Sequence, residues 1–128
     1  MMKDKYKSEL YKAKNLGAAG FGASHWWHQR FTALILVFTA LWVMTFFWQV
    51  CSNEVSGIIA CLRKPYNIVM LLVLALTSIY HAFLGMQVII EDYIKCRTYR
   101  LILLFGIKIF SVITVASFIV ATIYVIIL

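Results

Sequence analysis

The chain consists of three long apolar stretches separated by short polar segments. Residues 31–50, 66–90 and 101–128 are almost entirely apolar, and a helix needs roughly 20 residues to cross a hydrocarbon core of about 30 Å. No stretch shows the period-two alternation of a membrane β-barrel strand. Because lipid offers the backbone no hydrogen-bond partners, the pattern predicts an all-α integral membrane protein with three transmembrane helices.

The composition supports a membrane protein, and the length fits a single domain. Of the 128 residues, 63% are hydrophobic and 13% are charged, which is more apolar surface than a water-soluble domain of this size buries. We expect a single membrane-anchor domain over 1–128, in which 1–30 form a cytoplasmic arm and interface. Residues 1–15 are expected to be a surface helix or a disordered arm, and "GAAGFGAS" a flexible approach to the membrane. Neither a secretory signal nor a transit peptide fits the polar N-terminus.

Charge predicts the orientation of the chain. Basic residues are more numerous before the first apolar stretch and in the second connection than in the first connection. They are Lys3, Lys5, Lys7, Lys12, Lys14 and Arg30, then Lys95, Arg97 and Arg100, against Arg63 and Lys64. The positive-inside rule therefore predicts a cytoplasmic N-terminus and a C-terminus on the opposite side. This asymmetry accounts for the net charge of +7, so nucleic-acid binding is not expected.

The first connection contains a proline that can begin a helix, and two of the three cysteines. Pro65 is expected to begin the second helix, because the missing N–H of proline costs nothing in a first turn. The stretch "IIACL" before it is expected to form a half-buried turn. Cys51 and Cys61 share this connection and could pair, but the three cysteines are odd in number and lack CxxC spacing. We expect three ordinary thiols.

An ionisable side chain, His81, lies deep in the second apolar stretch, "TSIYHAFLGMQVIIEDYIK". Asp92 marks the end of that stretch, and the helical rise places His81 about 16 Å inside it. Eleven residues are close to three full turns, so His81 and Asp92 point to nearly the same side of the helix. One interpretation is an imidazole that hydrogen-bonds a neighbouring helix. The other is an axial haem ligand, for which Gly85, one turn away, would let a flat ring approach the backbone.

A six-coordinate haem needs a second ligand, and the remaining histidines are His25 and His28. Both precede the first span, about 15 Å from the depth of His81 by the same helical rise. One iron cannot bridge that distance, so the second ligand is expected from a partner subunit. The two histidines are expected to belong to the membrane interface, where either could relay a proton.

Other polar residues at the cytoplasmic side have both structural and functional interpretations. Tyr93 is either an interfacial anchor or a phenol donor to a quinone carbonyl, and Asp92 is either solvated or orients that phenol. Arg30 is either a positive-inside anchor or a partner of haem propionates and of the quinone pocket. Lys108, within the third span, is expected to snorkel or to face a partner.

Two blocks of the sequence resemble the hydrophobic membrane-anchor subunits, or D chains, of succinate dehydrogenase (respiratory complex II). The family's second helix carries a His, a Gly four residues later and an Asp-Tyr pair eleven and twelve residues later. His81, Gly85, Asp92 and Tyr93 have this spacing. The stretch "HWWHQRFTA" is similar to the H-W-x-x-Q-R-x-T-A entry to the family's first helix.

The resemblance implies that His81 is one axial ligand of a haem b whose other ligand comes from a second membrane anchor, the cytochrome b subunit. It implies that Tyr93 donates a hydrogen bond to the substrate ubiquinone with support from Asp92, and that Arg30 lies near the haem propionates and the quinone pocket. A flavoprotein subunit would oxidise succinate and an iron–sulfur subunit would pass the electrons to the quinone, so the chain alone is not catalytic. The expected location is the bacterial cell inner membrane. There the complex would link the tricarboxylic acid cycle to electron transport.

Three alternatives remain open from the sequence. The anchor of a fumarate reductase would use the same site in the opposite direction. A structural scaffold without a cofactor would leave His81 to a neighbouring helix. A small transporter or proton channel using His81 and Lys108 is less favoured, because the chain lacks the paired half-helices common in such proteins.

Overall fold

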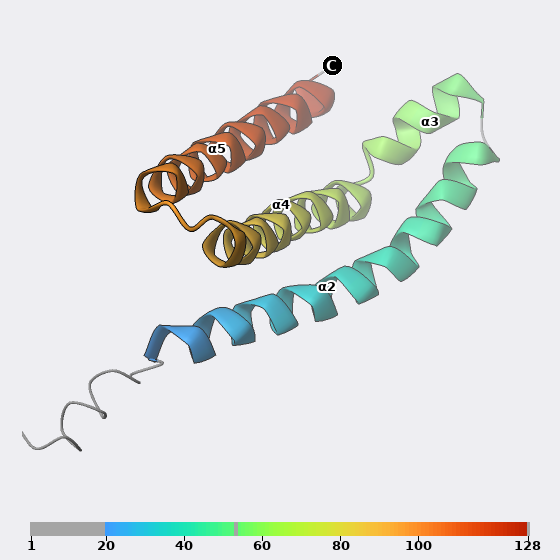
Figure 1. The fold of residues 1–128 in the computed structure, drawn as a ribbon. Coiled ribbons are helices and arrows are strands. Elements are labelled where there is room, and N and C mark those ends of the chain that lie inside the picture. Colours follow the sequence, from blue (N-terminus) through green and yellow to red (C-terminus); the bar gives the residue numbers. More distant parts are fainter. Residues whose placement is uncertain (1–19, 53, 128) are drawn as a thin grey trace, which may run out of the picture.

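The computed structural model describes residues 20–52 and 54–127, and all its regular elements are helices (Figure 1). They are α2 (Gly20–Cys51), α3 (Val55–Leu62), α4 (Pro65–Tyr93) and α5 (Arg97–Ile127). Of these, α2, α4 and α5 are long and apolar enough to cross a membrane. The predicted all-α membrane fold with three spans is thus confirmed over these residues. The expectation for 1–15 lies outside them.

Helix α2 begins earlier than the apolar pattern indicated. Its 32 residues start at Gly20, so much of the stretch predicted to be a flexible approach is helical, as is the whole interface segment "HWWHQR". The prediction of a flexible approach was wrong for residues 20–24, because glycine lowers helix propensity without preventing an extra turn at the start of a long helix. At ~1.5 Å per residue, α2 is about 48 Å long and extends beyond a core of about 30 Å.

The first connection contains a helix in place of the expected turn. Helix α3 has 8 residues, and Cys61 near its end is 3% exposed. The buried amide of Asn67 donates to the Cys61 carbonyl at 2.8 Å and joins α3 to the first turn of α4. Pro65 occupies the first turn of α4, as predicted. Cys51, Cys61 and Cys96 are all free thiols.

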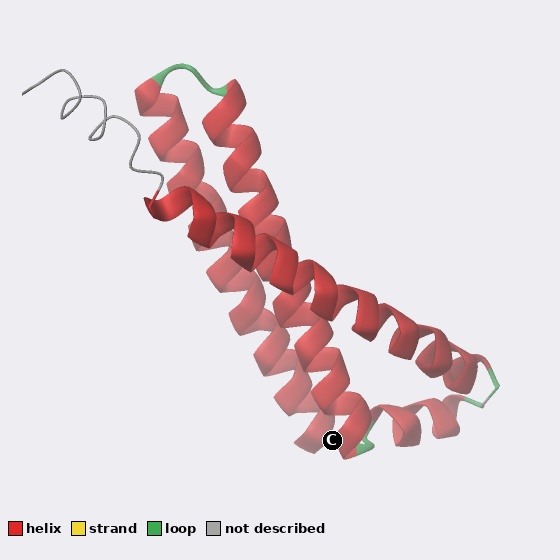
Figure 2. Ribbon diagram, turned by 90° about the horizontal axis from the view of Figure 1, so that it is seen from below, coloured by secondary structure: helices red, strands yellow, loops and turns green. Residues whose placement is uncertain are grey.

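Helix α4 lies in the middle of the structure. It contacts both α2 and α5, whereas α2 and α5 make no contact within the described residues. Figure 2 shows α4 and α5 running antiparallel from a short connection, with α2 crossing them at an angle. The start of α2 and the α4–α5 connection lie toward one end of the molecule, and α3 and the C-terminus toward the other (Figure 2).

Few side chains are buried within the chain. On α2 they are Thr32, Thr39 and Trp42, which share the side that packs on α4. Small side chains at such positions let helices approach closely in lipid, and each threonine hydroxyl donates to carbonyls of its own helix. No residue of α5 between Arg97 and Ile127 is buried. Most of the apolar surface is therefore left for lipid or other subunits.

Candidate functional site

The side chain of His81 lies between α4 and α2. Its Nδ1 is 2.8 Å from the hydroxyl oxygen of Thr32 on α2. The histidine is half-buried, and Thr32 is 7% exposed, so little water reaches this contact. The hydrogen bond to a neighbouring helix, one of the two interpretations from sequence, is therefore present. It occupies one of the two ring nitrogens.

The contacts of Thr32 determine which nitrogen of His81 carries the proton. The Thr32 oxygen also lies 2.8 Å from the His28 carbonyl and 3.1 Å from the Gln29 carbonyl, both of which can only accept. A hydroxyl has one proton and two lone pairs. If that proton pointed at His81, the hydroxyl oxygen would face the carbonyl oxygens without a hydrogen between them. The arrangement that satisfies all three contacts has Thr32 donating to its own helix and accepting from Nδ1–H of His81.

The second ring nitrogen of His81 is available to a ligand. Once Nδ1 carries the proton, Nε2 holds the lone pair, and it has no hydrogen-bond partner among the described residues. Gly85 is one turn away, and a Cβ built on it would meet no atom within 4 Å. An unprotonated ring nitrogen, with a glycine one turn away on the same side of the helix, fits the approach of a flat group to α4.

His28 lies closer to the level of His81 than the sequence indicated. It is four residues from Thr32 on the same helix, which is about 6 Å of helical rise, and Thr32 contacts His81. The ring of His28 approaches that of Tyr80 at 6.3 Å between centroids. The expected separation of about 15 Å was wrong because α4 is displaced along α2. The Nδ1 of His28 donates to the Ser24 carbonyl at 2.7 Å.

Asp92 and Tyr93 occupy the last turn of α4, three turns from His81. Both are exposed, and Tyr93 is 79% exposed. Successive helical residues point about 100° apart, and neither side chain has a hydrogen-bond partner within the described residues. Asp92 therefore does not orient the phenol of Tyr93 in this chain alone, and the phenol is free to meet a ligand at the end of the helix.

Arg30 does not come into contact with His81. Its guanidinium lies 5.4 Å from the centre of the Trp26 ring, one turn earlier on α2. Arg30 precedes Thr32 by two residues, so it points to nearly the opposite side of α2 from the one that packs on α4. The side chain is exposed and lies on the surface that another subunit or lipid headgroups would meet.

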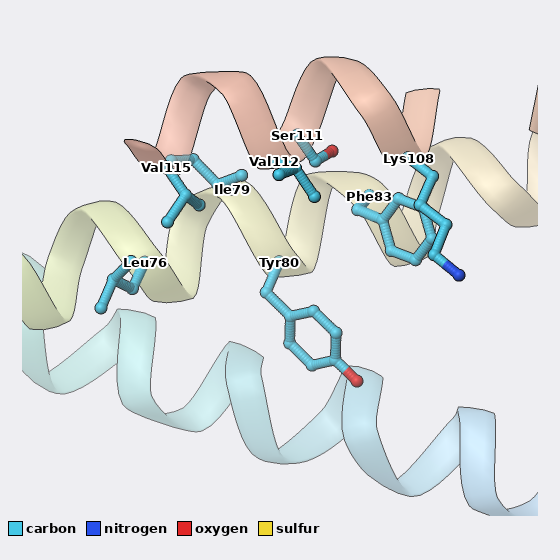
Figure 3. A pocket seen from close by; sticks show the side chains of 8 residues that line it. All are labelled: Leu76, Ile79, Tyr80, Phe83, Lys108, Ser111, Val112 and Val115. Carbon is cyan, nitrogen blue, oxygen red and sulfur yellow. The ribbon is translucent and has the colours of Figure 1, made fainter. Parts of the chain in front are cut away.

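Lys108 lines an apolar groove between α4 and α5 (Figure 3). The groove has a volume of about 290 Å³. Lys108 and Phe83 lie together at one end of it, and the Tyr80 ring points from its wall toward α2 (Figure 3). Lys108 is exposed and has no hydrogen-bond or ion-pair partner in the described part of the chain. Neither Thr32 nor His81 lines this groove.

Thr32 is the one member of the site that was given no role from the sequence. It belongs to the "HWWHQRFTA" block, but an isolated threonine in an apolar stretch also fits ordinary helix packing. Thr32 and Thr39 are separated by seven residues, the spacing of one helix-packing stripe. That spacing was the available signal that both face another helix.

Comparisons with known proteins agree with this architecture. Residues 4–126 match the family described as succinate dehydrogenase/fumarate reductase transmembrane subunit. The chain is 46% identical over 119 residues to the succinate dehydrogenase hydrophobic membrane anchor subunit of Rickettsia bellii, covering 93% of this chain and 95% of that protein. It is 40% identical over 119 residues to the subunit of the same name from Rickettsia prowazekii, with the same coverage.

A more distant relative extends the comparison. The succinate dehydrogenase membrane anchor subunit of Reclinomonas americana is 28% identical over 95 residues, or 71% of this chain and 78% of that protein. No solved structure matched the chain. The family match spans all three long helices and the 40–46% identities extend over most of the chain. The chain belongs to the succinate dehydrogenase/fumarate reductase transmembrane subunit family, as a membrane anchor subunit of succinate dehydrogenase.

Proposed function

We propose that this anchor subunit binds haem b through Nε2 of His81 and forms part of the ubiquinone-reduction site of a succinate:ubiquinone oxidoreductase. The observation that carries the proposal is the Nδ1 contact with Thr32, which leaves Nε2 with a lone pair and no partner among the described residues. Neutral imidazole is a common axial ligand of haem iron. Gly85, one turn away with no atom within 4 Å of its Cβ position, is compatible with a flat ring on this side of α4. When bound, the haem supplies one-electron chemistry.

The partner anchor, a cytochrome b subunit, would provide the second protein ligand of the iron. A single free nitrogen donor on the half-buried His81 side chain would fill one of the two protein-ligand positions of a six-coordinate haem. Arg30 would pair with haem propionates or with the quinone pocket through its exposed guanidinium. Its position on the opposite side of α2 from Thr32 requires that these groups lie toward the partner rather than between α2 and α4.

Tyr93 would hold the quinone headgroup. Its phenol is exposed at the end of α4 and free to donate a hydrogen bond to a quinone carbonyl. Asp92 would support that contact through the assembled complex, because it does not reach the phenol within the chain. The succinate chemistry belongs to a flavoprotein subunit, and an iron–sulfur subunit passes electrons to the quinone. This chain is therefore non-catalytic alone.

The chain would sit in the bacterial cell inner membrane with its N-terminus in the cytoplasm. The Rickettsia relatives are bacterial proteins. Arg30, Lys95, Arg97 and Arg100 belong to the start of α2 and to the α4–α5 region, which lie toward the same end of the molecule (Figure 2). The positive-inside rule assigns that end to the cytoplasm, where the soluble subunits would dock.

A cofactor-free scaffold would also contain a His81–Thr32 hydrogen bond. It does not require an unpartnered Nε2 beside a glycine, which is why the haem interpretation is favoured. A fumarate reductase anchor would use the same residues in the opposite direction. The succinate dehydrogenase names of the relatives favour the succinate-oxidising direction.

The test is the reduced-minus-oxidised optical spectrum of the intact complex carrying His81→Ala. We expect loss or strong alteration of the b-type signal, because the iron loses an axial nitrogen. The matched control is His28→Ala, which removes an imidazole from α2 near the same level and is expected to keep the spectrum. Co-purification of the flavoprotein and iron–sulfur subunits with each variant checks that both complexes assemble. An unchanged spectrum in His81→Ala would remove His81 as a ligand.

A further inference from the structure

We propose that Thr32 is a positioning residue for the haem-iron ligand: its hydroxyl fixes the tautomer and ring orientation of His81 and so tunes the iron. This inference rests on the haem ligation proposed above. It begins from one hydroxyl oxygen with three close polar neighbours, the His81 ring nitrogen at 2.8 Å and two carbonyls of its own helix.

The proton assignment makes Thr32 an acceptor toward His81. Its own hydrogen is engaged by the carbonyls of His28 and Gln29, so a lone pair is directed at the imidazole. The bond fixes the proton on Nδ1 and leaves Nε2 unprotonated. Without an acceptor at Nδ1 the two tautomers of a neutral imidazole are close in energy, and one of them has no lone pair on Nε2.

The surroundings make this role specific to Thr32. The side chain is 7% exposed, so bulk water does not readily replace a lost hydroxyl. The contact also joins α2 to α4, because the two residues are 49 positions apart in the chain. It therefore fixes the ring relative to a second helix as well as to its own backbone. Partners of this kind orient metal ligands and raise their basicity.

The effect on the iron follows from the direction of the hydrogen bond. Accepting a proton contact from Nδ1–H increases the electron density that Nε2 can donate, which favours the ferric state. Removing the acceptor is expected to favour the ferrous state. Outer partners of metal ligands affect metal binding on the order of tenfold or more, and the potential shifts only by the part of that effect that differs between the ferric and the ferrous state, taken here as tenfold. A tenfold change in the one-electron equilibrium is about 59 mV in midpoint potential.

The experiment is a redox titration of the haem in the intact membrane complex carrying Thr32→Val, which keeps the shape of the side chain but has no hydroxyl. We expect the midpoint potential to rise by the shift given above. Thr32→Ser restores the acceptor and is expected to return the potential toward that of the wild type. Rescue by serine would not follow from a purely steric role.

Thr39→Val is the matched control. Thr39 is 2% exposed on the same side of α2 and donates to the Ile35 and Leu36 carbonyls at 3.0 and 3.1 Å, but it has no partner on another described helix. Its replacement is expected to leave the haem potential unchanged. Loss of haem confined to Thr32→Val would also support the proposal, since serine and Thr39→Val would retain it.

Three results would overturn the inference. A Thr32→Val complex with haem at the wild-type potential shows that the hydroxyl does not act on the iron. Equal shifts in Thr32→Val and Thr39→Val indicate a general packing effect. A wild-type complex without a b-type signal removes the haem proposal itself, and this outcome is distinct because it appears before any Thr32 variant is compared.

Discussion

Replacing Tyr93 with phenylalanine tests whether the exposed phenol at the end of α4 binds the quinone. The change removes one hydroxyl and keeps the ring. Tyr93 is 79% exposed and its hydroxyl has no partner within the described residues. Inside this chain, therefore, the substitution removes no hydrogen bond and leaves no buried polar group unpaired. Its expected cost to the stability of the chain is close to zero.

The expected effect on quinone reduction can be worked from the hydrogen bond that the phenol would make. A neutral hydrogen bond contributes a net free energy of about 0.5–1.5 kcal/mol. Because about 1.4 kcal/mol corresponds to a tenfold rate ratio, kcat/KM for ubiquinone should fall roughly 2- to 12-fold. A larger loss would mean that the phenol acts on charge that develops during the reaction.

The assay is succinate-driven ubiquinone reduction by the intact complex, compared with succinate oxidation using an artificial acceptor. The first rate should fall in Tyr93→Phe and the second should stay unchanged. Tyr99→Phe is the matched control, because Tyr99 is 67% exposed near the start of α5, just beyond the same connection. Equal quinone kinetics in both variants and the wild type would refute the role of Tyr93 as a donor.

Two further substitutions test other parts of the structure. Asn67→Ala removes the buried amide that donates to the Cys61 carbonyl, so we expect destabilisation by about 1–3 kcal/mol, seen as a lower thermal midpoint of the solubilised complex. An unchanged midpoint would mean that this contact does not hold α3 to α4. Lys108→Met removes a charge that has no partner among the described residues, and we expect quinone reduction to be unaffected and stability to be equal or higher. Slower quinone turnover in that variant would give Lys108 a chemical role.

The three spans could be predicted from sequence because the bilayer imposes a length that few other structures require. The start of α4 was equally predictable, since Pro65 limits where a helix can begin. The start of α2 was not, because the end of an apolar stretch marks the edge of the hydrocarbon and not the end of the helix. Helix α3 was missed for a related reason: its 8 residues are too few for periodicity to separate a helix from a turn.

The candidate site was predictable residue by residue but not as an arrangement. The depth of His81 in the apolar stretch, and its spacing to Asp92 and Tyr93, indicated a buried imidazole with a functional role. Its contact with Thr32 depends on how α2 and α4 are displaced along each other, which a single sequence does not encode in any local pattern. The same displacement brought His28 nearer than expected. The direction of Arg30 followed from helical spacing once Thr32 was known to face α4.

The most direct test of the central claim is purification of the complex through a tag on this chain, followed by its reduced-minus-oxidised spectrum and its flavin and iron content. The account predicts a b-type haem signal together with flavin and iron–sulfur subunits in fixed proportion to the tagged chain. An intact assembly that contains flavin and iron–sulfur subunits but no b-type haem would contradict the role of His81. It would leave the chain as a structural anchor whose histidine is held by Thr32 alone.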